Sequence, residues 1–373
     1  MSSHRIFSNE VTLGALSLFL VASGLLFIYS TSSVYSLQQH GNQYHFFYRQ
    51  LIYAATGIGL MLLLASFDYR ELRPLAAWML LASGGLMLLV WVPGLGKTVR
   101  GARRWIDLGP LSFQPSELVK ITLVFFFADR LSRASFQQRK AELFAGYVKY
   151  WICALPLLVL VLAQKDFGST VICGIVVFLL LFLAGARWRY MALTVAAALP
   201  AAVVLCLDSY RWERIRMFAD PWKDPYGAGY QLVQSYISLG LGGTFGVGLG
   251  NGTQKLFYLP DAHTDFIFSV LGEELGLAGC CAFLILFLLF IVQGVRIALR
   301  APDRFGTLLA AGITFLIGVE FVLNVAVVLG LLPTKGMVLP FLSYGGSALL
   351  INLMAVGILC SVGRQEVLRP DLG

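Results

Sequence analysis

Charged residues are scarce in this sequence. Asp, Glu, Lys and Arg make up 13% of its 373 residues, whereas soluble globular domains carry about 25%. Hydrophobic residues account for 58%, and the mean hydropathy is +0.77. So little charge excludes an ordinary soluble domain and predicts an integral membrane protein.

Metal-binding patterns are also lacking. The six cysteines include no CxxC pair, and the four histidines show no metal-ligand spacing. Neither a zinc site nor a redox dithiol is therefore predicted. All six cysteines lie in or beside apolar runs and are interpreted as core residues. Cys280 and Cys281 are adjacent, and neighbours on a helix face different directions, so a disulfide is not expected.

Nucleic-acid motifs are missing as well, although the net charge is +8. The basic residues fall in short segments between apolar runs, and no basic groove with interleaved aromatic residues accompanies them. This distribution is typical of the charge bias that orients membrane proteins. We therefore predict a membrane as partner and no nucleic acid.

What the sequence does contain is a succession of apolar runs, and a helix needs about 20 such residues to cross a bilayer. We predict an all-α polytopic membrane protein with about ten transmembrane helices, forming a single membrane domain over residues 1–373. The expected spans are 11–30, 47–66, 75–92, 117–131, a fifth that ends over 154–164, 170–184, 190–207, 266–297, 305–332 and 345–362.

Positive charge predicts the orientation of these spans. The connections after the second, fourth, sixth and eighth spans carry most of the Lys and Arg, which places them and both termini in the cytoplasm. The large loop 208–265, after the seventh span, is then periplasmic. One group of cations falls on the outer side against the rule: Lys97, Arg100, Arg103 and Arg104.

The 208–265 segment is too rich in Arg, Asp, Glu and Lys to lie in hydrocarbon. A loop of this length is either a floppy insertion or a functional site, and we interpret it as a site. Cations on the same outer face would suit a phosphate or diphosphate. For any one of these cations taken alone, the alternative to anion binding is contact with lipid headgroups or a salt bridge with Asp107, Glu213, Asp220 or Asp224. The basic set comprises Lys97, Arg100, Arg103, Arg104, Arg211, Arg214, Arg216, Lys255 and Lys335.

Asp265 stands where this segment enters the eighth span. It could act as a general base there, although position alone favours the alternative that Thr264 or Asp265 caps a helix beginning at Phe266. Further along, Glu273 and Glu274 are expected to be buried and paired, with Lys120 as one candidate counter-charge. The structural role expected of His263 is a hydrogen bond, and Glu320 and Asn324 share one helix face.

Four stretches, in order along the chain, resemble the SEDS family of bacterial shape, elongation, division and sporulation proteins. Ala262, Gly272 and the Thr334–Gly336 stretch favour the division branch over the elongation branch. The four are ARRWIDLGPLSFQPSELVK (102–120), DPWKDPYGAGYQLVQS (220–235), LPDAHTDFIFSVLGEELG (259–276) and LPTKGMVLPFLSYGGS (332–347).

The resemblance implies a peptidoglycan glycosyltransferase that polymerises lipid II during septal wall synthesis. It implies that Asp265 deprotonates the acceptor sugar hydroxyl, so that the donor is attacked with inversion and undecaprenyl diphosphate leaves. The outer cations, with or without Mg²⁺ or Mn²⁺, would stabilise that diphosphate. The implied substrate-binding residues are Arg103, Arg104, Trp105, Glu117, Lys120, Asp166, Arg211, Arg214, Arg216, Lys255, His263, Thr264, Lys335 and Ser343.

Two positions depart from the family pattern: Lys165 replaces a usual proline, and Glu320 replaces a usual neutral amide. The implied location is the bacterial inner membrane at the septum, with the active face periplasmic. The implied protein partners are a class B penicillin-binding protein resembling FtsI, and the FtsQ, FtsL and FtsB complex. A flippase for the lipid-linked precursor and a non-catalytic division scaffold are the alternative functions.

Overall fold

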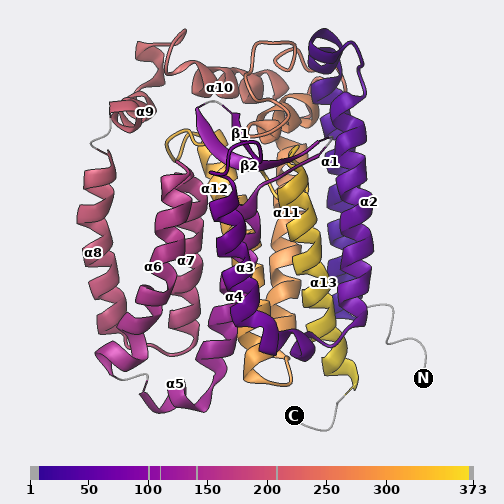
Figure 1. Cartoon of the computed structure of the whole chain (residues 1–373). Coiled ribbons are helices and arrows are strands. Elements are labelled where there is room, and N and C mark those ends of the chain that lie inside the picture. The colour runs from indigo at the N-terminus through magenta and orange to yellow at the C-terminus, as the bar shows by residue number, and fades with distance from the viewer. Residues whose placement is uncertain (1–7, 100, 110, 140–141, 207–208, 369–373) are drawn as a thin grey trace.

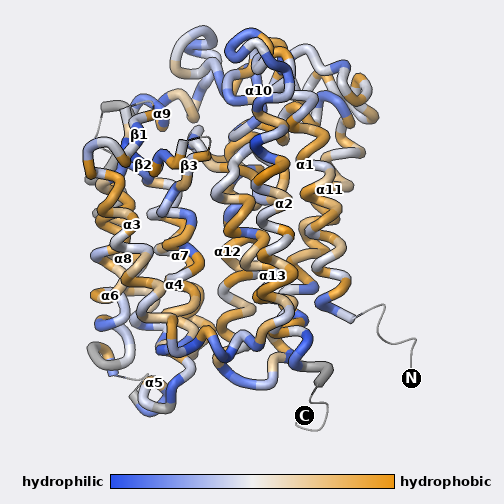
Figure 2. Tube along the Cα trace, turned by 45° about the vertical axis from the view of Figure 1, so that its right-hand side comes forward, coloured by the Kyte–Doolittle hydropathy of each residue, from blue (hydrophilic) through white to orange (hydrophobic). Residues whose placement is uncertain are grey.

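The computed structural model describes residues 8–368 except 100, 110, 140–141 and 207–208. Long helices run side by side, and a layer of shorter elements covers one end of the bundle (Figure 1). Apolar residues line the middle of the long helices, while hydrophilic residues gather at both ends (Figure 2). This distribution is the one a bilayer requires, because hydrocarbon offers no hydrogen bonds to polar groups.

The bundle confirms the prediction of an all-α polytopic membrane protein. Among the described residues, seven helices are long and apolar enough to cross a membrane, so the count of ten spans stays a prediction. The long helices are α1 (Asn9–His40), α2 (His45–Ser66), α3 (Ala76–Leu89), α4 (Pro115–Ser132), α6 (Lys149–Ala163), α7 (Phe167–Leu183), α8 (Trp188–Cys206), α11 (Ile267–Leu299), α12 (Arg304–Val328) and α13 (Gly346–Leu368).

The two ends of the bundle differ in what they carry. We call one the sheet end, because a three-stranded antiparallel sheet lies there with α9 (Ser209–Ala219), η3 (Pro221–Lys223) and α10 (Tyr230–Gly242) (Figure 1). The sheet consists of β1 (Gly96–Val99), β2 (Ala102–Leu108) and β3 (Leu111–Phe113). The opposite, α5 end carries α5 (Ala134–Arg139), η1 (Tyr69–Leu75) and η2 (Phe144–Val148). The start of α1 and the end of α13 also lie at the α5 end.

Helices α12 and α13 form the centre of the bundle, since most of their membrane-length windows are buried. Helix α13 packs tightly on α2 because two glycines remove side chains from the contact. A Cβ at Gly357 would lie 2.4 Å from the carbonyl oxygen of Met61, and one at Gly57 would lie 2.7 Å from a methyl of Leu353. Small residues of this kind let membrane helices approach closely.

Cations at the α5 end are held by buried or half-buried carboxylates. Asp303, the N-cap residue of α12, accepts hydrogen bonds from Arg70 (2.7 Å) and from the Tyr69 hydroxyl (2.6 Å). Asp129 pairs with Arg73 (2.9 Å) and Arg133 (2.7 Å). Burial works to raise the pKa of Asp303, but hydrogen bonds from Tyr69, Gly306 and Arg70 outweigh it and hold that pKa below its usual range.

Candidate active site at the sheet end

Over residues 209–265, the predicted large loop is a structured layer that contains α9 and α10. Asp265 is half-buried at the end of this segment, two residues before α11 begins at Ile267. Phe266 is the N-cap residue of α11. The N-cap position thus belongs to Phe266 and not to Thr264 or Asp265, and the helix begins one residue later than that alternative assumed.

Asp265 lies where three segments converge. A Cβ at Gly336 would come within 3.0 Å of its carboxylate Oδ2, so Gly336 lets the 333–345 segment pass directly over the acid. The Asn324 amide of α12 donates hydrogen bonds to the backbone carbonyls of Asp265 (3.0 Å) and Met337 (2.5 Å). Ser343 of the 333–345 segment donates a hydrogen bond to the Thr264 carbonyl. These contacts fix the backbone on both sides of the carboxylate.

Lys335 is adjacent in sequence to Gly336 and so belongs to the same site. Its ammonium lies 3.9 Å from the centroid of the Phe167 ring at the start of α7. A Cβ at Gly168 would lie 3.1 Å from the Lys335 Cε, so a larger residue there would crowd the lysine. An ammonium over an aromatic face is a favourable cation–π contact. The cation thus stands one residue before Gly336, which lies over the Asp265 carboxylate.

Two arginines join this site through backbone carbonyls. Arg214 of α9 donates to the Thr334 carbonyl (2.7 Å), one residue before Lys335. Arg104 of β2 donates to the carbonyls of Gln164 (3.1 Å) and Lys165 (2.5 Å), directly before α7. Both side chains are half-buried, and each guanidinium has five N–H donors, so further donors exist beyond these bonds.

The other predicted cations lie differently. Arg103 is exposed on β2 and donates to the Thr98 hydroxyl (3.2 Å). Trp105, two residues further along β2, is half-buried and lies opposite Lys97 in the register of β1 and β2. Arg216 is exposed on α9. Arg100 lies outside the described residues, and so does the side chain of Arg211.

Lys255 was predicted to help bind an anion, but the structure pairs it with a buried carboxylate. Its ammonium pairs with Glu274 at 2.5 Å, and the two side chains are 6% and 0% exposed. An ammonium neutralised in this way does not add to an anion site. The prediction that Glu273 and Glu274 are buried is confirmed, but the choice of Lys120 as their counter-charge is wrong.

Lys120 instead joins α4 to α12. It pairs with Glu117 at 2.7 Å and with Glu320, and all three side chains are at most 8% exposed. Glu320, which departs from the family pattern, thus forms a charge pair in the core. Glu117 and Lys120 thus bind each other inside the bundle, and their predicted contact with substrate stays a prediction.

Asp166 is buried and caps α7. Its carboxylate accepts hydrogen bonds from the Ser169 N–H (3.2 Å) and hydroxyl (2.8 Å), and from Gln114 (3.1 Å) and Ser116 (3.2 Å) near the start of α4. It therefore joins the starts of α4 and α7, directly before Phe167, the residue over which Lys335 lies. Before it, Lys165 has a φ of 61°. Proline cannot adopt that angle, so the departure at Lys165 does change the local turn.

His263 lies in an aromatic cluster beside Asp265. Its ring centroid is 5.5 Å from that of Tyr35 and 5.1 Å from that of Phe46. Its backbone carbonyl accepts the Tyr344 N–H at 2.9 Å.

Sequence reasoning missed the role of Asn324 next to Asp265, although an amide in an apolar span was the available signal.

A divalent cation does not fit this arrangement as a purely protein-bound ion. Within the described part of the chain, no three His, Cys, Asp or Glu side chains gather so that they could hold a metal. Mg²⁺ prefers several oxygen ligands, and the groups described around Asp265 are mainly cations and amides.

Fold and site together define a polytopic helical membrane protein that sets one carboxylate beside several cations at one end of its bundle. Comparison with known proteins gives the family. The model of the FtsW, RodA and SpoVE family, described as cell cycle proteins, matches residues 11–367, and the chain belongs to this family. The resemblance to the SEDS proteins is thereby confirmed.

Relatives match over nearly their whole length. A protein of Geobacter sulfurreducens named "Probable peptidoglycan glycosyltransferase FtsW" is 43% identical over 348 residues, 93% of this chain and 92% of that protein. Stage V sporulation protein E of Bacillus subtilis is 38% identical over 361 residues, 96% of this chain and 98% of that protein.

Solved structures share the fold. The rod shape determining protein RodA of Thermus thermophilus has a TM-score of 0.69 and 28% identity, with 95% of this chain and 96% of that chain covered. A chain from a structure described as "Structural coordination of polymerization and crosslinking by a peptidoglycan synthase complex" has a TM-score of 0.78 and 32% identity. That match covers 95% of this chain and 97% of the other.

Proposed function

We propose that this protein is a peptidoglycan glycosyltransferase that polymerises lipid II into glycan strands, with Asp265 as its general base. The observation that carries the proposal is the convergence of Asp265, Gly336 and Lys335 at the sheet end. The names of the FtsW relatives support the reaction class, and the site supplies the two groups that such a reaction needs.

The chemistry requires one base and one cationic pocket. Asp265 accepts the proton of the acceptor sugar 4-hydroxyl while that oxygen bonds to the anomeric carbon of the donor. The bond from this carbon to the diphosphate oxygen breaks on the opposite side, so the configuration inverts. Undecaprenyl diphosphate departs with the electron pair and is already a good leaving group. A second carboxyl acting as general acid, which an inverting glycosidase uses, is therefore not needed.

Lys335 and the guanidinium groups of Arg214 and Arg104 would stabilise the departing diphosphate. Each is anchored before substrate arrives: Lys335 over Phe167, Arg214 on Thr334 and Arg104 on the turn before α7. Cations held in place need little rearrangement when negative charge develops, which is the main source of electrostatic catalysis.

The charge distribution supports a periplasmic site. Many arginines lie in the connections at the α5 end, and the positive-inside rule assigns such connections to the cytoplasm. Both termini would then be cytoplasmic, and the sheet end would face the periplasm of the inner membrane. We place the protein at the septum, with a class B penicillin-binding protein and FtsQ, FtsL and FtsB as partners. The arginines are Arg70, Arg73, Arg130, Arg133, Arg187, Arg189, Arg296, Arg300 and Arg304.

The test is reconstitution of the purified chain and its transpeptidase partner in vesicles that contain labelled lipid II. Glycan strands are expected from the wild type and none from Asp265→Asn. Asp261→Asn is a matched control, because Asp261 is also half-buried in this segment and has a φ of 56°, which asparagine tolerates. Strands made equally well by Asp265→Asn contradict the base. Lipid transfer across the bilayer without strands favours a flippase, and neither activity favours a scaffold.

A further inference from the structure

Helix α11 is interrupted near its sheet end. Gly276 has a φ of 67° and a ψ of −167°, which divides the helix into a short part, 267–275, and a long part that follows. A Cβ at Gly276 would lie 2.3 Å from the backbone nitrogen of Gly246, so a neighbouring segment occupies the break. The short part begins two residues after Asp265 and ends at this break.

The segment that follows α10 supplies the hydrogen bonds that the broken helix has lost. The N–H groups of Val247 and Gly248 donate to the carbonyls of Glu273 and Glu274, both at 3.0 Å. In return, the N–H groups after the break donate to carbonyls of that segment: Leu277 to Gly243 at 2.9 Å and Ala278 to Thr244 at 3.0 Å. The orientation of the short helix thus depends on 243–248, because the long part of α11 does not continue into it.

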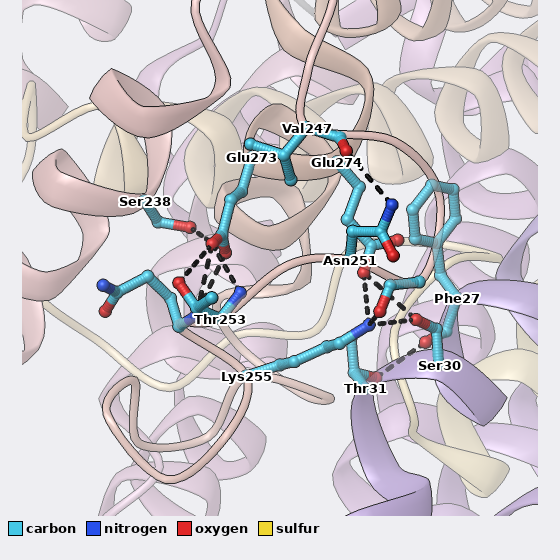
Figure 3. A network of polar contacts seen from close by, with 12 residues as sticks. Phe27, Ser30, Thr31, Ser238, Val247, Asn251, Thr253, Lys255, Glu273 and Glu274 are labelled. Carbon is cyan, nitrogen blue, oxygen red and sulfur yellow. Dashed lines mark hydrogen bonds and ion pairs between the residues drawn. The ribbon is translucent and has the colours of Figure 1, made fainter.

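Two buried carboxylates strengthen this attachment (Figure 3). Glu273 accepts hydrogen bonds from the N–H (2.7 Å) and hydroxyl (3.0 Å) of Thr253 and from the Ser238 hydroxyl of α10 (3.3 Å). Glu274 pairs with Lys255 at 2.5 Å. The side chains of Glu273 and Glu274 are thereby tied to 253–255, the stretch that leads to Asp265.

Helix α1 takes part in the same network. The Ser30 hydroxyl donates to Glu274 at 3.1 Å and accepts a hydrogen bond from the Lys255 ammonium at 2.7 Å. The three residues therefore form a closed triangle between α1, α11 and the 249–265 segment (Figure 3). No other described side chain from the membrane-spanning part of α1 is bonded to this pair.

We propose that Glu274, Lys255 and Ser30 are positioning residues that hold the short helix of α11, and with it Asp265, in register with Lys335. This inference rests on the proposed function. A helix of nine residues is too short to be stable by itself, and its glycine end is a natural pivot. A buried ion pair contributes little net stability compared with an apolar pair of the same size, so its use here favours a role in geometry.

The experiment separates geometry from folding with a double variant. Glu274→Gln alone leaves the Lys255 ammonium buried without its carboxylate, and Lys255→Met alone leaves the carboxylate of Glu274. Each single variant should therefore lower both the thermal midpoint and kcat. The double variant K255M/E274Q removes both charges of this pair and should recover the thermal midpoint. Its kcat should stay about 100-fold below wild type, because misplacement by about 1 Å has an effect of that size. The KM for lipid II should be unchanged.

Hydrogen–deuterium exchange provides a readout that needs no activity. In the double variant, exchange should rise in 259–275 and stay at the wild-type level in 280–299. Lys223→Met is the matched control, since Lys223 belongs to the same outer layer and its side chain is 73% exposed. Recovery of kcat together with the thermal midpoint, or wild-type exchange over 259–275, would overturn the inference. A wild type that makes no strands contradicts the proposed function instead, and exchange then decides the positioning role alone.

Discussion

The amide of Asn324 donates a hydrogen bond to the backbone carbonyl of Asp265 at 3.0 Å. The two residues are far apart in the sequence, and Asn324 is 1% exposed near the end of α12. The same amide also donates to the Met337 carbonyl. One buried side chain thus fixes the acid and the segment that crosses it.

Replacement of Asn324 by aspartate should therefore reduce turnover. Aspartate has the same size but cannot donate to the two carbonyls when ionised, so both carbonyls lose a bond worth about 1–3 kcal/mol when buried. We expect a lower thermal midpoint and kcat reduced by about tenfold or more, measured by melting and by glycan synthesis. Asn42→Asp makes the same change at an exposed site where the oxygen accepts a hydrogen bond. Equal effects of the two substitutions would contradict the role of Asn324.

Lys335→Met should lower kcat while the fold is retained. The substitution keeps the aliphatic length beside Phe167 and Gly168 but removes the charge proposed to meet the diphosphate. Loss of one preorganised electrostatic group reduces kcat by about 100- to 1,000-fold. Lys97→Met removes an exposed ammonium that lies 3.8 Å from Asp107, and it should have little effect. A Lys335→Met enzyme with wild-type turnover would exclude this lysine from the reaction.

Glu320→Gln should be tolerated. Lys120 would keep Glu117 at 2.7 Å, and the glutamine carbonyl can still accept its hydrogen bond. One Glu320 oxygen is buried without a hydrogen-bond partner among the described residues, so removal of this charge should preserve or raise the thermal midpoint. Lys120→Met leaves two buried carboxylates and should destabilise the protein by about 3–5 kcal/mol. If Glu320→Gln lowered the thermal midpoint more than Lys120→Met, the Glu320 carboxylate would be needed for stability.

Acid should weaken the α5 end through Asp303. The pKa of this carboxyl is lower in the folded protein than in the unfolded chain, whose value is about 3.9. Its contribution to stability is therefore complete above the unfolded pKa and is lost as pH falls through the folded pKa. Asp303→Asn keeps a good N-cap residue for α12 but does not titrate. The difference between the thermal midpoints of wild type and variant should be constant near neutrality and shrink below about pH 4.

The sequence was sufficient for elements that depend on local composition. Apolar runs located the long helices because hydrocarbon demands them over about 20 residues, and the positive-inside pattern grouped the connections that meet at the α5 end. The sheet at 96–113 was not predicted. Its strands are short and carry the adjacent charges of Arg103 and Arg104, which obscure the alternation typical of a strand.

The sequence singled out residues that the structure brings together at the sheet end, such as Asp265 and Lys335, but it did not predict the contacts that each lysine makes. Lys255 and Lys335 look alike in the sequence, since each is a single lysine in a connection between apolar runs. Only the fold shows that Lys255 meets Glu274 while Lys335 lies over Phe167. The pairing of Lys120 with Glu320 joins positions 200 residues apart, and helical spacing cannot predict contacts between distant helices.

The tight seat of α13 against α2 has a consequence for biogenesis. This central helix follows all the other described helices in the chain, and its seat depends on Gly57 and Gly357. Because chains fold from the N-terminal side as they are made, the earlier helices must leave a groove open until α13 is inserted into the membrane. The face of α2 around Gly57 is therefore exposed only in the nascent protein, before α13 packs against it.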